Sequence, residues 1–588
     1  MKQYKYEQTM DSSINKSTVI EFISQVPQLS IISRKLVSIC EVSESQADDI
    51  LLLALNAHSK PLFSSELLGG IANIVRPDDI SKWDMSEVEP DIHYSADIID
   101  LICEHKLLTM RSGISEATEA EYMLFELNVE LPEDIVALLN MSKVKFPSVL
   151  PARDLVNAND SRYVNKSLDL GIFTNSRYNT SEGVPLDIIN TQGQLALSID
   201  ERSITVENIS EADYAEQFDN DELTQANLDL CVKHILAEGN TFYSYPKLDS
   251  RLRLYAGNNI LNYQGGNYQK SLIEFKNKEV VELPSFTGVT KRKGTYVVKL
   301  PRGIVFTSND PELCHYYCIT NDIESELINE GSLHWLKIEI ASQLGWDKLL
   351  FEDRIAKVNN VLIHGALMSD EIIDIARSEG HFYTFLKAVR AYHDVLDGVA
   401  TGYPLGLDAT NQFAQIGAVL SGNHTDAFNG NLIDPNYRHD LYMLVYEEMK
   451  KSRAFQMDVE LSRKIVKQAV MPSSYGSKQA PENTFRHDDA TQWALNVEIF
   501  WESMAKVVPG TMEVMEKLGT VMNNAYESDV TEQSWTLPDG CVARSMPVSK
   551  SIDKGMYQHF PVTTTVMGES TTVFTKQRRN CGIEIFAK

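Results

Sequence analysis

The sequence predicts an α+β protein of mostly helical content, built from more than one domain. Its 588 residues exceed the usual size of one compact domain, and 43% are apolar while 23% are charged. In the first 240 residues, apolar side chains recur at three- and four-residue spacing, which favours helices. From Tyr243 onward, glycine turns and strand-like runs appear. This composition excludes wholesale disorder, collagen and coiled coil.

No segment of the chain resembles a membrane or secretion signal. No apolar run approaches the roughly 20 residues that a membrane helix needs, and the stretch from Met1 to Glu7 lacks the apolar core of a signal peptide. The 7 cysteines are odd in number and scattered, so they do not predict a disulfide framework. We therefore expect a protein of a reducing, cytoplasmic compartment without a membrane partner.

Negative charge is concentrated in the first two-fifths of the chain. Residues 1–240 contain 18 Lys and Arg against 40 Asp and Glu, so they carry −22 of the formal net charge of −28. The later residues are close to neutral. They can hold a local basic channel beside acidic metal ligands, even though the pI of the whole chain is near 4.9.

Several elements follow from local pattern. Helical spacing is clearest in residues 17–25, 46–57 and 95–108, and the acidic stretch 207–222 fits a boundary or a solvated helix face. The β-forming residues from Gly294 to Leu300 predict a strand. Four flanking cations make this hairpin basic: Lys291, Arg292, Lys293 and Arg302. Such a hairpin either contacts a phosphate backbone or is an ordinary solvated hairpin.

One short segment offers ligands for a metal. Cys314, His315 and Cys318 could each bind zinc, but a closed zinc site needs four ligands. The sequence holds no second Cys/His pair at a workable spacing. We therefore do not expect zinc here.

The sharpest chemical pattern lies between Leu461 and Lys478. Arg463 and Lys467 are four residues apart, so a helix places both on one face. Two cations on one face repel each other unless the face binds a polyanion, and Arg and Lys are both suited to phosphate. Gly476 is a natural helix end after Tyr475. The alternative is an ordinary basic surface helix.

Two further segments carry candidate residues. The run from Tyr403 to Leu420 reads as a short strand that ends in Asp408 and passes into a helix. A carboxylate there can hold Mg²⁺ or cap the helix. In the segment Asp249-Ser250-Arg251-Leu252-Arg253-Leu254-Tyr255, a strand would point Arg251 and Arg253 the same way.

Taken in chain order, these segments resemble the single-subunit RNA polymerases of bacteriophages and mitochondria, from about Tyr243 to Lys588. Residues 249–255 and 262–265 are similar to the family's Asp-x-Arg-Gly-Arg-x-Tyr and Asn-Pro-Gln-Gly, and Asp408 falls at its motif A aspartate. The other matching segments are 330–338, 351–355, motif B from Arg463 to Gly476, Trp501-Glu502-Ser503, and Trp535 to Gly540.

The resemblance implies a right-hand fold of palm, fingers and thumb. Residues 1–240 would form an acidic, helical N-terminal or thumb-like region. Residues 241–430 would form the first half of the palm, with a basic insertion at about 280–325, and residues 431–588 the fingers. The reaction would be DNA-templated RNA synthesis from NTPs with two Mg²⁺ ions, and a viral source would place it in the host cytoplasm.

The resemblance also implies a role for each matching residue. Asp408 and the carbonyl of Ala409 would bind Mg²⁺, and Arg463 and Lys467 would hold the nucleotide triphosphate. Tyr475 would check the 2′-hydroxyl of the nucleotide. Further contacts would come from Gly476 and Tyr442 to the nucleotide, and from Arg251, Arg253 and Tyr255 to the template and hybrid.

The chain also departs from the family pattern. Leu252 replaces a glycine, Gln412 and Phe413 replace smaller residues, and Pro472 should kink the motif B helix. The family places a second metal-binding aspartate in an apolar His-Asp-Ser hairpin. Three His-Asp pairs occur here, at 393–394, 439–440 and 487–488, and all precede Trp535 in helical or polar flanks.

We therefore expect the larger chain of a split, heterodimeric polymerase, whose second catalytic aspartate comes from a partner polypeptide. Its other partners would be the DNA template, the RNA product, NTPs and an initiation or promoter-recognition factor. One alternative is a non-catalytic nucleic-acid-binding remnant or accessory subunit. A DNA polymerase of the same fold is a weaker alternative, because Asp-x-Arg-x-Arg is typical of the RNA branch.

Overall fold

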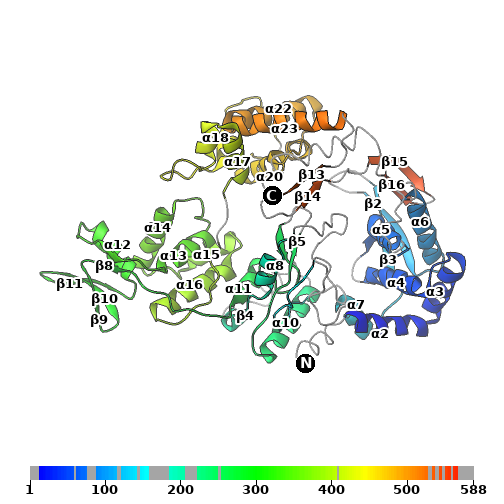
Figure 1. The fold of residues 1–588 in the computed structure, drawn as a ribbon, viewed down its shortest axis with the longest axis horizontal. Helices are drawn as coiled ribbons and strands as arrows, with labels where there is room; N and C mark the ends of the chain where they lie inside the picture. Colours follow the sequence, from blue (N-terminus) through cyan, green and yellow to red (C-terminus); the bar gives the residue numbers. More distant parts are fainter. Residues whose placement is uncertain are drawn as a thin grey trace.

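The computed structural model is mostly helical, with small antiparallel sheets (Figure 1). Its description covers the following residues: 12–58, 61–75, 88–114, 121–141, 146–157, 184–204, 222–248, 253–406, 410–457, 459–527, 533–536, 542–545, 550–557 and 560–566. Helices dominate the order of elements, as the sequence predicts for an α+β protein. Within these ranges no helix is long and apolar enough to cross a membrane.

The N-terminal part packs six helices on a three-stranded sheet. The helices are α2 (Ser12–Gln25), α3 (Pro27–Ile39), α4 (Glu44–Leu55), α5 (Ser64–Val75), α6 (Val88–Glu104) and α7 (Glu133–Met141). The strands, in sheet order, are β1 (Leu62–Phe63), β3 (Glu121–Leu127) and β2 (Leu108–Ile114). A capping box between Ser43 and Gln46 begins α4. The three helices predicted here are confirmed, although α6 ends at Glu104 and Leu108 begins a strand.

A second core lies around short paired strands. The helices are α8 (Leu186–Gly193), α10 (Glu222–Ala237) and α11 (Asn267–Leu272). Strand β4 (Leu197–Ile199) pairs with β7 (Ile273–Phe275), and β5 (Pro246–Leu248) pairs with β6 (Leu254–Ala256). Phe242 is fully buried in this core, among residues of β4, α10 and α11.

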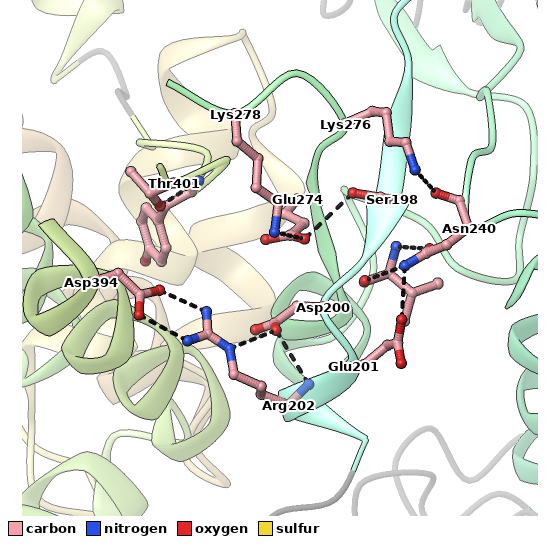
Figure 2. Close-up of polar contacts among 12 residues, drawn as sticks. Ser198, Asp200, Glu201, Arg202, Asn240, Glu274, Lys276, Lys278, Asp394 and Thr401 are labelled. Carbon is pink, nitrogen blue, oxygen red and sulfur yellow. Dashed lines mark hydrogen bonds and ion pairs between the residues drawn. The ribbon is translucent and has the colours of Figure 1, made fainter. Parts of the chain in front are cut away.

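Ion pairs join this second core to the helices that follow it. Figure 2 shows Arg202, on the short helix η6 (Glu201–Ser203), between two carboxylates. Its two terminal nitrogens donate to Asp394 at 3.0 and 2.8 Å, and its Nε donates to Asp200 at 3.3 Å. Arg390 also donates to Asp200, at 3.2 Å. Because Asp394 and Arg390 lie on one helix, these pairs hold that helix against β4.

That helix is α16 (Phe382–Leu396), which packs with three others: α13 (Leu333–Gln343), α14 (Phe351–Ile363) and α15 (Asp370–Ser378). An extension precedes them in the chain. It contains β8 (Ser285–Phe286), β9 (Val289–Arg292), β10 (Thr295–Leu300), β11 (Gly303–Ser308), α12 (Pro311–Thr320) and β12 (Leu327–Asn329). The strand predicted over residues 294–300 is therefore confirmed as β10, and it pairs with both β9 and β11.

The last large core is helical. It contains α17 (Gln412–Ser421), α18 (His424–Asn429), α19 (Leu441–Lys450), α20 (Arg463–Ser474), α21 (Gln479–Thr484), α22 (Ala490–Val507) and α23 (Pro509–Glu527). Phe413, Phe485 and Phe500 are buried at its centre. The described strands that follow it form two hairpins, β13 (Gln533–Thr536) with β14 (Val542–Ser545) and β15 (Lys550–Tyr557) with β16 (Phe560–Val566).

Candidate functional site

Helix α20 presents two cations on one side. Ser462 caps its N-terminus by accepting a hydrogen bond from the backbone of Ile465. The adjacent side of the helix is buried in the core through Val466, Ala469 and Val470. Arg463 is half-buried and Lys467 is exposed, so the helix keeps its cations at the surface because its apolar residues fill the core.

Tyr442 lies against both of these cations. The guanidinium carbon of Arg463 is 5.1 Å from the centre of the Tyr442 ring, and the Nζ of Lys467 is 5.7 Å from it. The Tyr442 hydroxyl donates to the sulfur of Met471 at 2.8 Å. The structure thus brings Tyr442, Arg463 and Lys467 together, three of the residues that the sequence pattern singled out. We call these three residues the cation–tyrosine cluster.

Asp440 holds Arg463 in this cluster. It is the N-cap of α19, where its Oδ1 accepts hydrogen bonds from the backbone of Tyr442 and Met443 at 3.1 and 3.3 Å. Its Oδ2 accepts a hydrogen bond from the Nε of Arg463. A cation in the first turn of a helix is opposed by the helix dipole, and this carboxylate offsets that cost. No sequence pattern marked Asp440 as the partner of Arg463, although an Asp just before a helix is a recognisable cap.

Lys467 differs from Arg463 in having no such anchor. Among the residues that the structure describes, no carboxylate forms an ion pair with it. Its ammonium group is therefore available to an anion from solution. Together, a fixed guanidinium and a mobile ammonium on an aromatic surface suit the binding of a phosphate group.

The end of α20 has the geometry that the sequence predicts. Gly476 has a φ of +93°, a conformation that favours glycine. Its N–H donates to the carbonyl of Ser473 at 2.9 Å, and the N–H of Ser477 donates to that of Pro472 at 3.0 Å. Pro472 does not end the helix, which continues to Ser474. Pro472 has no N–H to bond the carbonyl of Gln468, so α20 lacks one backbone hydrogen bond in its last turn.

The segment that leads to Asp408 is fixed on one side by backbone pairing. Thr401 exchanges hydrogen bonds of 2.9 and 3.0 Å with Glu279, and the carbonyl of Gly402 accepts from Phe275 at 2.8 Å. A Cβ on Gly402 would come within 2.2 Å of the Phe275 carbonyl, so only glycine fits this close approach. Residues 403–406, the described part of the expected strand, form no strand, and the nearest backbone pairing is this isolated bridge at Thr401.

Glu339 of α13 holds the same segment from the other side. Its carboxylate accepts hydrogen bonds from Tyr403 at 3.3 Å and from Gln343 at 2.7 Å, and it also accepts one from the backbone of Gly406. Burial raises the pKa of Glu339, while these hydrogen bonds lower it. No motif marked this residue in the sequence. Only the packing of α13 on the segment from Thr401 to Gly406 reveals it.

Asp408 and Ala409 themselves lie outside the described residues, as does Arg251. The N-cap position of α17 belongs to Asn411, which has a left-handed φ of 51° and makes no side-chain capping hydrogen bond. The two alternatives for Asp408, a Mg²⁺ ligand and a helix cap, both stay predictions.

Arg253 and Tyr255 belong to a separate hairpin. Arg253 is exposed, just before β6, and its guanidinium carbon lies 5.7 Å from the centre of the Tyr255 ring. Gln264 holds the edge of β6, because it accepts from Ala256 at 2.8 Å and donates to Leu254 at 3.3 Å. The predicted motif at residues 262–265 is therefore a brace for this hairpin. No described contact joins Arg253 or Tyr255 to the cation–tyrosine cluster.

Metal ligands do not gather elsewhere in the described part of the chain. No group of three or more His, Cys, Asp or Glu side chains there could hold a metal ion. Cys314 and Cys318 are buried against Val298, and burial raises the pKa of the Cys314 thiol to about 12. His315 stacks on Phe286 at 4.2 Å. This segment is the packed helix α12.

Comparison with known proteins finds a family model that matches part of the chain. Residues 326–535 match the family model for DNA-dependent RNA polymerase. This region runs from the residue before β12 to β13. It contains Asp408 and the cation–tyrosine cluster. It does not include Arg253 or Tyr255. No curated protein matches the chain.

Proposed function

We propose that this chain synthesises RNA on a DNA template, as the larger subunit of a split phage-type RNA polymerase. The observation that carries the proposal is the placement of Arg463 and Lys467 over Tyr442, inside the region that matches DNA-dependent RNA polymerase. An exposed cation pair beside an aromatic ring suits a nucleoside triphosphate. An ordinary basic surface helix does not require two cations to lie on the same aromatic ring.

In the proposed reaction, the 3′-hydroxyl of the RNA attacks the α-phosphorus of an NTP and pyrophosphate leaves. Asp440 orients the guanidinium of Arg463, which leaves its terminal nitrogens to meet the oxygens of the triphosphate. Lys467 follows the negative charge that accumulates on the leaving pyrophosphate. Tyr442 forms the surface beneath both cations.

Asp408 and the carbonyl of Ala409 supply the hard oxygen atoms that Mg²⁺ prefers. Two Mg²⁺ ions, when bound, supply charge neutralisation and activation of the attacking hydroxyl. Glu339 and the pairing of Thr401 with Glu279 hold the segment that precedes Asp408. These contacts support the proposal that the segment holds Asp408 in a fixed position.

Tyr475 is proposed to contact the sugar of the incoming nucleotide, with Gly476 allowing close approach of the backbone. Both residues follow the cation face of α20 by about two turns, so one helix would align the triphosphate and the sugar. The hairpin that carries Arg251, Arg253 and Tyr255 would contact the template and the hybrid. The domain names follow the same proposal: a thumb-like region at 1–240, the first half of the palm at 241–430 and the fingers at 431–588.

A second polypeptide is proposed to supply the other catalytic aspartate. The aspartates of the three His-Asp pairs in this chain do not lie in the surroundings that the family's second metal-binding aspartate has. Asp394 pairs with Arg202, Asp440 pairs with Arg463, and Asp488 is in the turn before α22. None of them lies between two strands, as the family's second metal-binding aspartate does.

RNA extension by the complex purified through a tag on this chain tests the proposal. The substrate is an RNA primer annealed to DNA, with NTPs and Mg²⁺. Asp408→Asn should abolish extension, because a neutral amide is a poor substitute for a carboxylate beside two cations. The exposed Asp397→Asn is the matched control and should keep full activity. Near-normal extension by Asp408→Asn would contradict the assignment, and a wild-type complex that only binds nucleic acid would favour the non-catalytic alternative.

A further inference from the structure

The extension before α13 carries the most concentrated positive charge outside the proposed site. Residues 285–308, here called the basic arm, contain β8 to β11. They hold Lys291, Arg292, Lys293, Lys299 and Arg302 and no Asp or Glu, in a chain whose net charge is −28. All five cations are exposed. Among the residues that the structure describes, none of the five forms an ion pair.

The cross-strand register gives the arm two different faces. Val298 lies opposite Val289 and Phe306, and these side chains pack on α12, where Phe306 stacks on Tyr317 at 4.4 Å. Because side chains alternate along a strand, the neighbouring positions point to the other face. That other face carries Thr295 opposite Arg292, then Val297 between Thr290 and Thr307, and after a bulge Lys299 opposite Ile304. Val297 is buried there, whereas Arg292, Lys299 and the two flanking threonines, Thr290 and Thr307, are exposed.

A buried ion cluster fixes the arm to the rest of the molecule. Asp310 follows the arm in the chain. Its carboxylate forms an ion pair with the Nζ of Lys337 at 2.6 Å and accepts a hydrogen bond from the hydroxyl of Tyr392 at 2.8 Å. Lys337 is fully buried, and it also contacts Glu312 at 3.0 Å and Asn359 at 2.8 Å. Lys337 lies on α13 and Tyr392 on α16. The cluster therefore holds the base of the arm rigidly on two helices.

From this arrangement we propose that the basic arm binds the phosphate backbone of duplex DNA, at a surface separate from the cation–tyrosine cluster. Figure 1 shows β9 to β11 at the left edge of the molecule, beyond α12 and away from α20. The bound duplex would be the template outside the site of synthesis. The identity of the duplex as template rests on the proposed function, whereas the binding itself rests on the arm alone.

Three features favour duplex DNA as the occupant. An acidic protein repels a polyanion in general, so it needs a local excess of positive charge to hold one. The arm carries five exposed cations, against the exposed Glu324 and Glu326 of the segment that lies beside Thr287. The five cations are spread over the two hairpins of the three-stranded sheet β9–β10–β11, and Lys293 and Arg302 lie in its turns, where a phosphate backbone can reach them. Lys, Arg and Thr side chains are also the usual partners of phosphate oxygens. Because the arm is already rigid, its cations lose little conformational freedom on binding.

Salt-dependent binding by the full-length chain tests this proposal. The arm variant combines Arg292→Gln, Lys293→Gln and Lys299→Gln. The control variant removes the same charge from exposed lysines elsewhere, through Lys348→Gln, Lys450→Gln and Lys517→Gln. The probe is a fluorescent 30-base-pair duplex of arbitrary sequence, titrated by anisotropy at several KCl concentrations. Unchanged thermal melting of both variants would show that they remain folded.

We expect the arm variant to bind the duplex at least about tenfold more weakly at 0.1 M salt. The slope of log affinity against log salt should fall by about 2 to 3, since each lost phosphate contact removes about 0.9. The control variant should keep the wild-type slope. Equal slopes for the arm variant and the wild type would overturn the proposal. Loss of affinity for single-stranded DNA with unchanged affinity for duplex would also overturn it.

A second assay separates this proposal from the proposed function. Extension of an RNA primer on a short hybrid without flanking duplex should be the same for the arm variant and the wild type. Arm-dependent duplex binding by a chain that never makes RNA would leave the arm proposal standing and refute the polymerase. Normal RNA extension together with duplex binding that does not depend on the arm would refute the arm proposal and leave the polymerase proposal standing.

Discussion

Two lysines show how environment decides what an ammonium group can do. Lys467 is exposed beside Tyr442, so its charge remains available to an anion. Lys387 of α16 is buried, and its Nζ donates to the backbone carbonyl of Ile273 at the start of β7. Burial lowers the pKa of Lys387 to about 8, although Asp200 and Glu274 raise it. The first lysine is suited to binding and the second to holding two elements together.

Lys467→Ala should weaken the use of nucleotide far more than the binding of DNA. A charge-assisted contact to phosphate is worth about 1.5–3 kcal/mol, so kcat/KM for NTP should fall roughly 10- to 150-fold. The neighbouring exposed Lys464→Ala is the control and should change kcat/KM less than about twofold. Steady-state extension and DNA anisotropy on the same preparations provide the measurement. An equal loss of DNA affinity would instead identify this side of α20 as a nucleic-acid surface.

Lys387→Met should remove a pH dependence of stability. In the unfolded chain the amine has its ordinary pKa, near 10.4, whereas the folded value is about 8. Between these values the unfolded state binds more protons. The stability of the wild type should therefore rise with pH across this window, by roughly 3 kcal/mol at most. Below pH 8 the full cost of the buried charge is present.

Denaturant unfolding from pH 7 to 10.5 measures this effect in both chains. The free energy of unfolding of the wild type should increase relative to that of Lys387→Met as the pH rises. The exposed Lys464→Met is the control and should follow the wild type. A difference between wild type and Lys387→Met that stays constant over the whole range would show that the buried amine does not change protonation there.

At the scale of elements, close helix packing shapes the core that carries the proposed site. Helices α17 and α23 approach so closely that a Cβ on Gly417 would lie 2.1 Å from the hydroxyl of Thr511. The carboxylate of Asp426, on α18, is fully buried and accepts hydrogen bonds from Gly510 at 2.8 Å and from the Thr511 hydroxyl at 2.6 Å. This carboxylate satisfies donors in the first turn of α23.

Gly417→Val should therefore destabilise this core by about 1–3 kcal/mol, because the added side chain has no space beside Thr511. The exposed Leu420→Val on the same helix is the control, with an expected effect below about 0.5 kcal/mol. Thermal unfolding and hydrogen exchange in α17 and α23 measure the difference. Equal stability of the two variants would mean that the helices can separate without cost.

At the scale of the whole molecule, the chain consists of several cores that pairs of charged residues connect. Residues 19–139 form one hydrophobic cluster, whereas the clusters around Phe242, Val395 and Phe500 belong to later parts of the chain. Asp200, Arg202 and Asp394 join two of these parts, as Figure 2 shows. The proposed site uses one core for its cations and another for the segment before Asp408.

The proposed division of labour between two polypeptides gives a prediction at this scale. The chain freed of any co-purifying protein should show no Mg²⁺-dependent RNA extension, because Asp408 would supply only one of the two aspartates that the proposed reaction needs. Adding back the partner fraction should restore extension. Asp408→Asn with the same partner fraction is the control and should stay inactive. Robust extension by the chain alone would contradict the split.

Local pattern by itself determined much of this protein. Spacing of apolar residues predicted α2, α4 and α6, and a four-residue interval placed Arg463 and Lys467 on one side of α20. Glycine chemistry predicted the end of α20 at Gly476. These predictions succeed because backbone geometry and the positions of nearby side chains depend on only a few neighbouring residues.

Only the tertiary structure decided how distant residues meet. It paired Arg463 with Asp440, buried Lys337 and Lys387, and brought Glu339 against the segment before Asp408. It also joined β1, β3 and β2 into one sheet, in a region whose pattern had indicated helices. A buried charge finds its partner through the packing of whole elements, and no spacing along the chain encodes that packing.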